Sequence, residues 1–166
     1  MNLKSLLCAT ALFVGCWNPV PAKADPGTDA LLSKVRQYVT IYKNPDQCDN
    51  QVYSGSYNWK TQTMVLCINS PLTAYDHDTV KHEVWHVIQS CHTPTDAKFL
   101  NTVMPVDDED WDKYVLSNIS ARTLNHIHDG YPETHWNAEI EAFSAARMLS
   151  SEQMNELFIN SCVPTP

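Results

Sequence analysis

Hydrophobic residues recur at helical spacing in several segments of the chain. Between Thr28 and Tyr42, leucine, valine and tyrosine side chains stand three or four positions apart, which predicts an amphipathic helix. A second apolar stripe begins after Asp78, the expected N-cap, and is widened by Trp85 and Ile88, so we expect this helix to be largely buried. Further helices are predicted at 110–123, 136–149 and 151–162.

A short β-sheet is predicted between the first two helices. The segments "QVYSGSYNW" (51–59) and "TMVLCI" (63–68) are rich in β-branched and aromatic residues, and the three residues between them predict a β-hairpin. The polar, proline-punctuated stretch 93–110 is expected to be a connection with one short helix, and "HDGYPETH" (128–135) breaks the chain. Together these elements predict one α+β domain that is mainly helical.

The first 24 residues have the organisation of a cleaved signal peptide. Lys4 supplies a positive n-region, an apolar run follows, and a small-x-small pattern ends at Ala24. The apolar run is too short to span a bilayer. We therefore expect a secreted or periplasmic protein whose folded domain covers 25–166, with no stable membrane insertion after cleavage. The alternative is a lipoprotein modified at Cys16.

Charge and cysteine content agree with export. The formal net charge of −8 makes nucleic acid and anionic membranes poor partners. Four cysteines remain outside the predicted signal peptide, and an even number in an exported chain indicates two disulfides. We favour Cys48–Cys67, which would staple the hairpin, and Cys91–Cys162, which would tie the C-terminus to the second predicted helix.

The segment "KHEVWHVIQSCH" (81–92) contains residues suited to binding a metal. His82 and His86 are four positions apart, so on a helix they differ by about 40° in direction and can each offer a nitrogen to one ion. Glu83 lies beside them, where it can accept a proton from a metal-activated water. This is the H-E-x-x-H arrangement of zinc peptidases. The alternative is a buried helix whose histidines are hydrogen-bonded core residues.

Through "HEVWH" and the hairpin before it, the chain resembles the zincin metallopeptidases. The resemblance covers about residues 50–92 and 131–150. It implies a small sheet packed over the motif helix, a Zn²⁺ cofactor, and a peptide or protein substrate that runs along the sheet edge and is hydrolysed. The alternative function is a zincin-like metal-binding, structural or effector protein without proteolytic activity.

Three residues compete as the third metal ligand. Gluzincins take it from a second helix, often from a glutamate before alanine, and Glu141 matches that pattern beside a stripe of alanines. The resemblance therefore implies Glu141, with Glu139 and His92 as alternatives. His92 has the metzincin spacing, but Gln89 replaces the glycine of that pattern, so we expect the helix to continue and to turn His92 away.

Two supporting roles are also expected at the site. Thermolysin-like enzymes carry an aspartate four residues after the ligand glutamate, where this chain has Ala145. The partner that orients a ligand histidine must then come from elsewhere, from Asp76 or a backbone carbonyl. Tyr131 is a candidate donor to the oxyanion formed at the attacked carbonyl. Its rivals are His126, His128 and His135.

Overall fold

The computed structural model of the chain describes residues 25, 27–50, 54–104 and 111–164. The predicted signal peptide and the start of the predicted hairpin lie outside these ranges. Within them, no helix combines the length and the apolar character that crossing a bilayer requires. Both predicted disulfides, Cys48–Cys67 and Cys91–Cys162, are present. Such bridges are typical of proteins that fold in an oxidising compartment.

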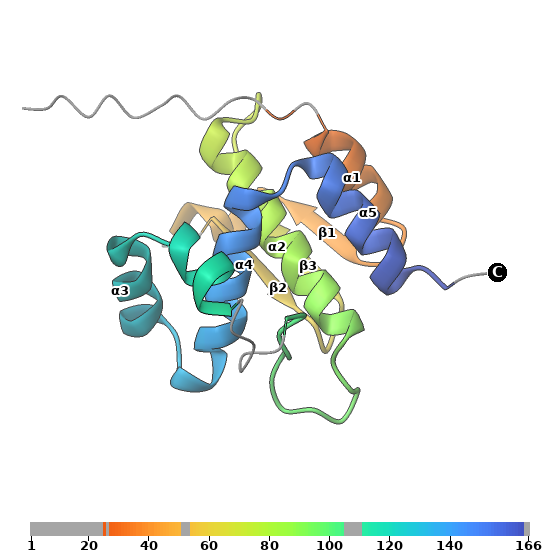
Figure 1. The fold of residues 1–166 in the computed structure, drawn as a ribbon. Helices are drawn as coiled ribbons and strands as arrows, with labels where there is room; N and C mark the ends of the chain where they lie inside the picture. The colour runs from red at the N-terminus through yellow and green to blue at the C-terminus, as the bar shows by residue number, and fades with distance from the viewer. Residues whose placement is uncertain (1–24, 26, 51–53, 105–110, 165–166) are drawn as a thin grey trace, which may run out of the picture.

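A long central helix organises the fold (Figure 1). This helix, α2, crosses one face of the small sheet, with α4 along one side and α1 and α5 along the other. α3 packs on the outer side of α4. The predicted mainly helical α+β class is confirmed, as are the last two helices. The bounds are α1 Thr28–Val35, α2 Ala74–Cys91, α3 Ala121–Gly130, α4 Trp136–Met148 and α5 Ser151–Cys162.

The sheet has three strands in the order β1-β3-β2. The predicted hairpin is found as β2 (Gly55–Asn58) antiparallel to β3 (Thr63–Leu66), which leaves β2 at an edge. The predicted helix from Thr28 is wrong beyond α1, because Thr40–Lys43 forms β1, parallel to β3. The β-branched and aromatic "TIYK" gains backbone partners from β3, and this pairing outweighs the helical spacing of the apolar residues.

α2 begins earlier than its apolar stripe indicates. Thr73 is the N-cap, and its hydroxyl accepts a hydrogen bond from the backbone N–H of Asp76. The Asp76 carboxylate in turn accepts the Thr73 N–H at 2.7 Å, which completes a capping box. Asp78, the predicted cap, instead lies inside the helix and pairs with Lys81 at 3.3 Å.

The segment between α2 and α4 is less regular than predicted. The predicted helix 110–123 is a π-helical turn at Trp111–Val115 and a 3₁₀ turn at Leu116–Asn118, and a new helix starts at Ala121. Ser120 caps this helix by accepting the Thr123 N–H at 3.1 Å, which explains why the helix starts there. In the connection after α2, the described residues 93–104 contain no helix.

Two hydrophobic clusters fix α2 and α4 relative to the sheet. The larger joins the apolar face of α2 to α1, β3, α5 and the alanine stripe of α4, including Val84, Ile88 and Ala142. The smaller lies behind α4 and contains Trp111 and Ile127. Because small side chains line the α2–α4 contact, the two helices can approach closely enough for polar groups to meet between them.

Candidate metal site

Three buried side chains converge between α2 and α4. His82 and His86 lie one turn apart on α2, and Glu139 reaches them from the first turn of α4. His82 Nε2 lies 3.1 Å from His86 Nε2, and the Glu139 oxygens lie 3.3 Å and 3.4 Å from these two nitrogens. Their ligand atoms all fall within 4.8 Å of one another, so the group could hold a metal ion. The predicted pairing of the two histidines is therefore confirmed as a geometry.

Glu83 lies against this trio with an unpaired oxygen. Its side chain is buried, and its Oε2 has no hydrogen-bond partner within the described part of the chain. His82 Nδ1 is unpaired in the same sense. Buried polar atoms without partners are costly in a protein interior.

β2 approaches the site closely at Gly55. A Cβ at this position would lie 2.6 Å from Glu83 Oε1 and 2.9 Å from Thr79 Cγ2. The strand therefore packs against the Glu83 side chain in a space that only a glycine leaves open.

The structure places Glu139, and not the predicted Glu141, in the trio. Glu141 is 2% exposed and contacts α2 at Trp85 and Gln89, not at the two histidines. Its Oε2 accepts hydrogen bonds from Trp85 Nε1 and Gln89 Nε2, and its Oε1 accepts one from the backbone of Met104. Both oxygens are therefore occupied by N–H donors, and Glu141 is not a member of the group formed by the two histidines and Glu139. The carboxylate that joins the two histidines is therefore Glu139 and not the predicted Glu141.

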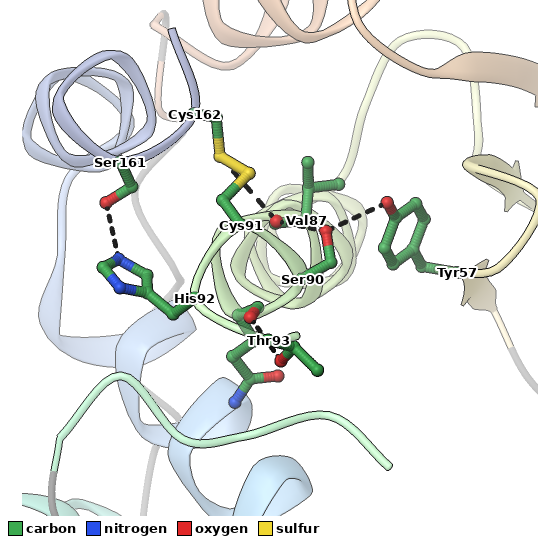
Figure 2. Close-up of a disulfide and its surroundings, with 9 residues drawn as sticks. Tyr57, Val87, Ser90, Cys91, His92, Thr93, Ser161 and Cys162 are labelled. Carbon is green, nitrogen blue, oxygen red and sulfur yellow. Dashed lines mark hydrogen bonds between the residues drawn. A yellow bond between two sulfur atoms is a disulfide. The ribbon is translucent and has the colours of Figure 1, made fainter. Parts of the chain in front are cut away.

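His92 stands apart from the trio, as the uninterrupted helix predicted. It follows the last residue of α2, is exposed, and its Nε2 lies 3.0 Å from Ser161 Oγ on α5 (Figure 2). In the same view, the Cys91–Cys162 disulfide ties this end of α2 to α5, and Tyr57 of β2 reaches Ser90. The C-terminal end of α2 is therefore attached to α5 and to β2, and His82 and His86 lie before this end, toward the N-terminus of the helix.

The side chain of Gln89 is a hydrogen-bond partner of His86. His86 Nδ1 lies 2.7 Å from Gln89 Oε1. The predicted alternatives, Asp76 or a backbone carbonyl, are wrong for His86, because Asp76 is engaged in the capping box and with Asn69.

A cleft of about 780 Å³ opens onto the trio. Glu83, Tyr131 and the strand residues of β2 share its walls with the two histidines. His126 and His135 also line it, whereas the His128 ring packs on Trp136 at 4.3 Å and is absent from the lining. The remaining aromatic side chains in the walls are Tyr57, Trp59, Tyr75, Phe99 and Phe143.

The charges at the site shift one another's pKa. Burial alone would lower the pKa of His86, but Glu139 and Glu83 raise it to about 9. Burial alone would raise the pKa of Glu139, but the neighbouring imidazoles lower it well below its usual range. Burial raises the pKa of Glu83, against the attraction of both histidines. These shifts indicate a site that favours a carboxylate at Glu139 and gives Glu83 an unusually high proton affinity for a glutamate.

Tyr131 lines the cleft beside the trio. Burial, followed by the negative charges of Glu139 and Glu83, raises the pKa of its phenol. The hydroxyl therefore stays protonated at neutral pH and can donate into the cleft.

Two residues that contact the site were not predicted from the sequence, although each carried a recognisable sequence signal. Gln89 stands three residues after His86, so the two side chains share a helix face. Gly55 begins β2, and a glycine in a strand often marks a close backbone approach.

No family model matches the sequence, and no curated protein or solved structure is significantly similar to it. The resemblance to zincins therefore stays with the motif and its setting.

Proposed function

We propose that the chain is an exported zinc-dependent peptidase that hydrolyses peptide bonds in the cleft beside α2. The observation that carries the proposal is the convergence of His82, His86 and Glu139 next to the free oxygen of Glu83. Two histidines and one carboxylate are the protein ligands of many catalytic zinc sites, which keep one position open. Export is supported by the leader pattern and by the two disulfides.

Zinc is favoured over other ions by the donors and their spacing. Tetrahedral ligands about 2.0–2.1 Å from an ion lie roughly 3.3 Å apart. The separations of 3.1, 3.3 and 3.4 Å between the three side chains match this value. Magnesium and calcium prefer sets of oxygen ligands and more of them.

The residues around the trio take distinct roles in this proposal. His82, His86 and Glu139 would hold the zinc ion, which would act as a Lewis acid on the scissile carbonyl and would make water easier to deprotonate. Glu83 accepts the proton of the attacking water and passes it to the leaving amine. Tyr131 donates a hydrogen bond to the carbonyl oxygen as negative charge develops on it.

The substrate is proposed to be an extended peptide that lies along β2. This strand is at the edge of the sheet, and Gly55, Ser56 and Tyr57 line the cleft. An edge strand offers backbone groups to an added strand without regard to side-chain sequence. The aromatic walls provide apolar contact for side chains on either side of the scissile bond.

A metal site that only stabilises the fold is the second candidate. It is supported by the burial of all three ligand side chains and by the way they join α2 to α4. The two functions predict different effects of a chelator: loss of peptide cleavage for a peptidase, and loss of thermal stability alone for a structural site. The test is digestion of casein and of a peptide library by the purified mature chain, before and after a chelator and after zinc is restored. A peptidase loses cleavage and regains it with zinc; a purely structural site shows a lower melting temperature and no cleavage in any arm.

A further inference from the structure

Glu141 is the centre of a buried hydrogen-bond network beside the proposed ligands. Four N–H groups donate to its carboxylate at 2.7–3.0 Å. Two come from α2 side chains, Trp85 and Gln89, and two from the backbone of Val103 and Met104. A buried carboxylate with four N–H partners is satisfied as an anion. It therefore needs no cation as a partner, and its hydrogen bonds can fix the positions of the groups that donate to it.

Glu141 fixes the orientation of the Gln89 side-chain amide. Gln89 Nε2 donates to Glu141 Oε2 at 2.8 Å and to the Ala138 carbonyl at 2.9 Å. Both partners are acceptors, so the amide cannot be flipped without placing its oxygen against two oxygens. Gln89 Oε1 must then face His86 Nδ1, 2.7 Å away, as an acceptor. An acceptor at this distance requires the hydrogen of a neutral His86 ring to be on Nδ1.

We propose that Glu141 and Gln89 are positioning residues, which hold His86 with Nδ1 protonated and the lone pair of Nε2 directed into the trio. The inference rests on the proposed metal site and adds to it the hydrogen bonds that orient one of its ligands. His82 has no such partner, since its Nδ1 is unpaired within the described part of the chain. The two histidines therefore differ: a hydrogen bond at Nδ1 fixes the ring orientation and tautomer of His86, and no such bond fixes those of His82 in the described structure.

The same carboxylate also anchors the connection that follows α2. The backbone N–H groups of Val103 and Met104 end a stretch whose Phe99 and Leu100 line the cleft. Thr93 holds the start of that stretch, because its hydroxyl accepts the Asn101 N–H at 2.9 Å. Glu141 thus connects the orientation of a ligand to the position of one cleft wall.

Two measurements on the full mature chain test the inference. The first is zinc affinity, by competition with a chromogenic chelator, in wild type and in Gln89→Met, which keeps the side-chain length but removes the acceptor. Loss of a hydrogen bond that orients a ligand histidine typically weakens metal binding about 10- to 100-fold. The matched control is Ser144→Ala, which removes a buried hydrogen bond of α4 to Val115 and leaves His86 untouched. We expect the control to bind zinc as wild type does.

The second measurement needs no variant. Nitrogen-15 NMR of the metal-free wild type, at a pH where the imidazoles are neutral, reports which nitrogen of His86 carries the hydrogen. The inference expects Nδ1–H at His86 and no such constraint at His82.

The outcomes separate this inference from the proposed function. Unchanged zinc affinity in Gln89→Met overturns the positioning role while leaving the metal site intact. Absence of zinc binding by wild type removes the proposed function, and the NMR result alone then decides: Nδ1–H at His86 supports the positioning role, and Nε2–H overturns it.

Discussion

Glu139 and Glu141 stand two residues apart on α4 and face opposite sides of its contact with α2. Residues at this spacing differ by about 200° in direction on a helix. Glu139 reaches His82 and His86, while Glu141 accepts N–H groups from Trp85 and Gln89. Both carboxylates are buried, and each is compensated differently: one by imidazoles that could share a metal with it, the other by four fixed dipoles.

Replacing Glu83 by Gln should abolish hydrolysis and leave zinc binding unchanged. The amide cannot accept a proton, and Glu83 is not among the three grouped ligand residues. A general base contributes about 10²–10⁴-fold to rate. Peptide cleavage and zinc content measured on the same preparation check this. Cleavage at the wild-type rate would exclude Glu83 as the base.

Replacing Gly55 by Ala should lower activity more than it lowers stability. The new Cβ would meet Glu83 Oε1 at 2.6 Å and Cγ at 2.8 Å, so either the side chain or β2 must move. A displacement of about 1 Å at a catalytic group can cost 10²-fold in rate. The matched control is Gly130→Ala, whose Cβ would meet only His126 at 4.0 Å. Equal activity in the two variants would argue against a close fit between strand and base.

Replacing Tyr131 by Phe should reduce turnover and leave zinc content as in wild type. Loss of an oxyanion donor costs on the order of 100-fold in kcat. Because the raised pKa of Tyr131 keeps its phenol protonated, wild-type activity should show no loss from this group between neutral pH and pH 9. The measurement is kcat against pH for both proteins. Unaltered turnover would remove Tyr131 from the mechanism.

The Asp76 capping box should make the free energy of unfolding depend on pH in the acidic range. Burial alone would raise the pKa of Asp76, but hydrogen bonds from Thr73 and Asn69 lower it below its ordinary value. Its contribution is therefore complete above about pH 4 and is lost as pH falls through the lower, folded-state pKa.

Asp76→Asn should reduce the free energy of unfolding by about 1–2 kcal/mol at neutral pH. The difference from wild type should shrink as the pH falls below about 4, because both chains then lack the carboxylate charge. Urea unfolding at several pH values measures it. Asp78→Asn is the control, because it makes the same change two residues further along α2, at a half-exposed carboxylate that pairs with Lys81 and takes no part in the cap. Equal losses in the two variants would contradict the cap assignment.

Features set by local spacing were predictable from the sequence. The hairpin, α2, α4 and α5 follow from apolar periodicity, and His82 and His86 had to share a face once α2 formed. The continuation of α2 past Gln89 was also predictable from local sequence, because the chain has no glycine there to end the helix. The two disulfides were favoured as a staple of the hairpin and as a tie between the C-terminus and α2, and both are present.

Features set by helix rotation and strand pairing were not predictable. The alanine stripe of α4 predicted its contact with α2, but Glu139 and Glu141 flank that stripe on opposite sides. Which glutamate meets the histidines depends on how α4 is rotated against α2, and packing behind α4 around Ile140 decides it. β1 was missed because its hydrogen-bond partner, β3, lies more than twenty residues away.

Zinc stoichiometry of Glu139→Ala tests the central claim most directly. Elemental analysis after dialysis is carried out on wild type, Glu139→Ala and, as the control, His92→Ala. We predict one zinc ion per chain in wild type and in His92→Ala, and loss of most of the zinc in Glu139→Ala, because its carboxylate is the acidic member of the trio. A full complement of zinc in Glu139→Ala, or none in wild type, would contradict the account.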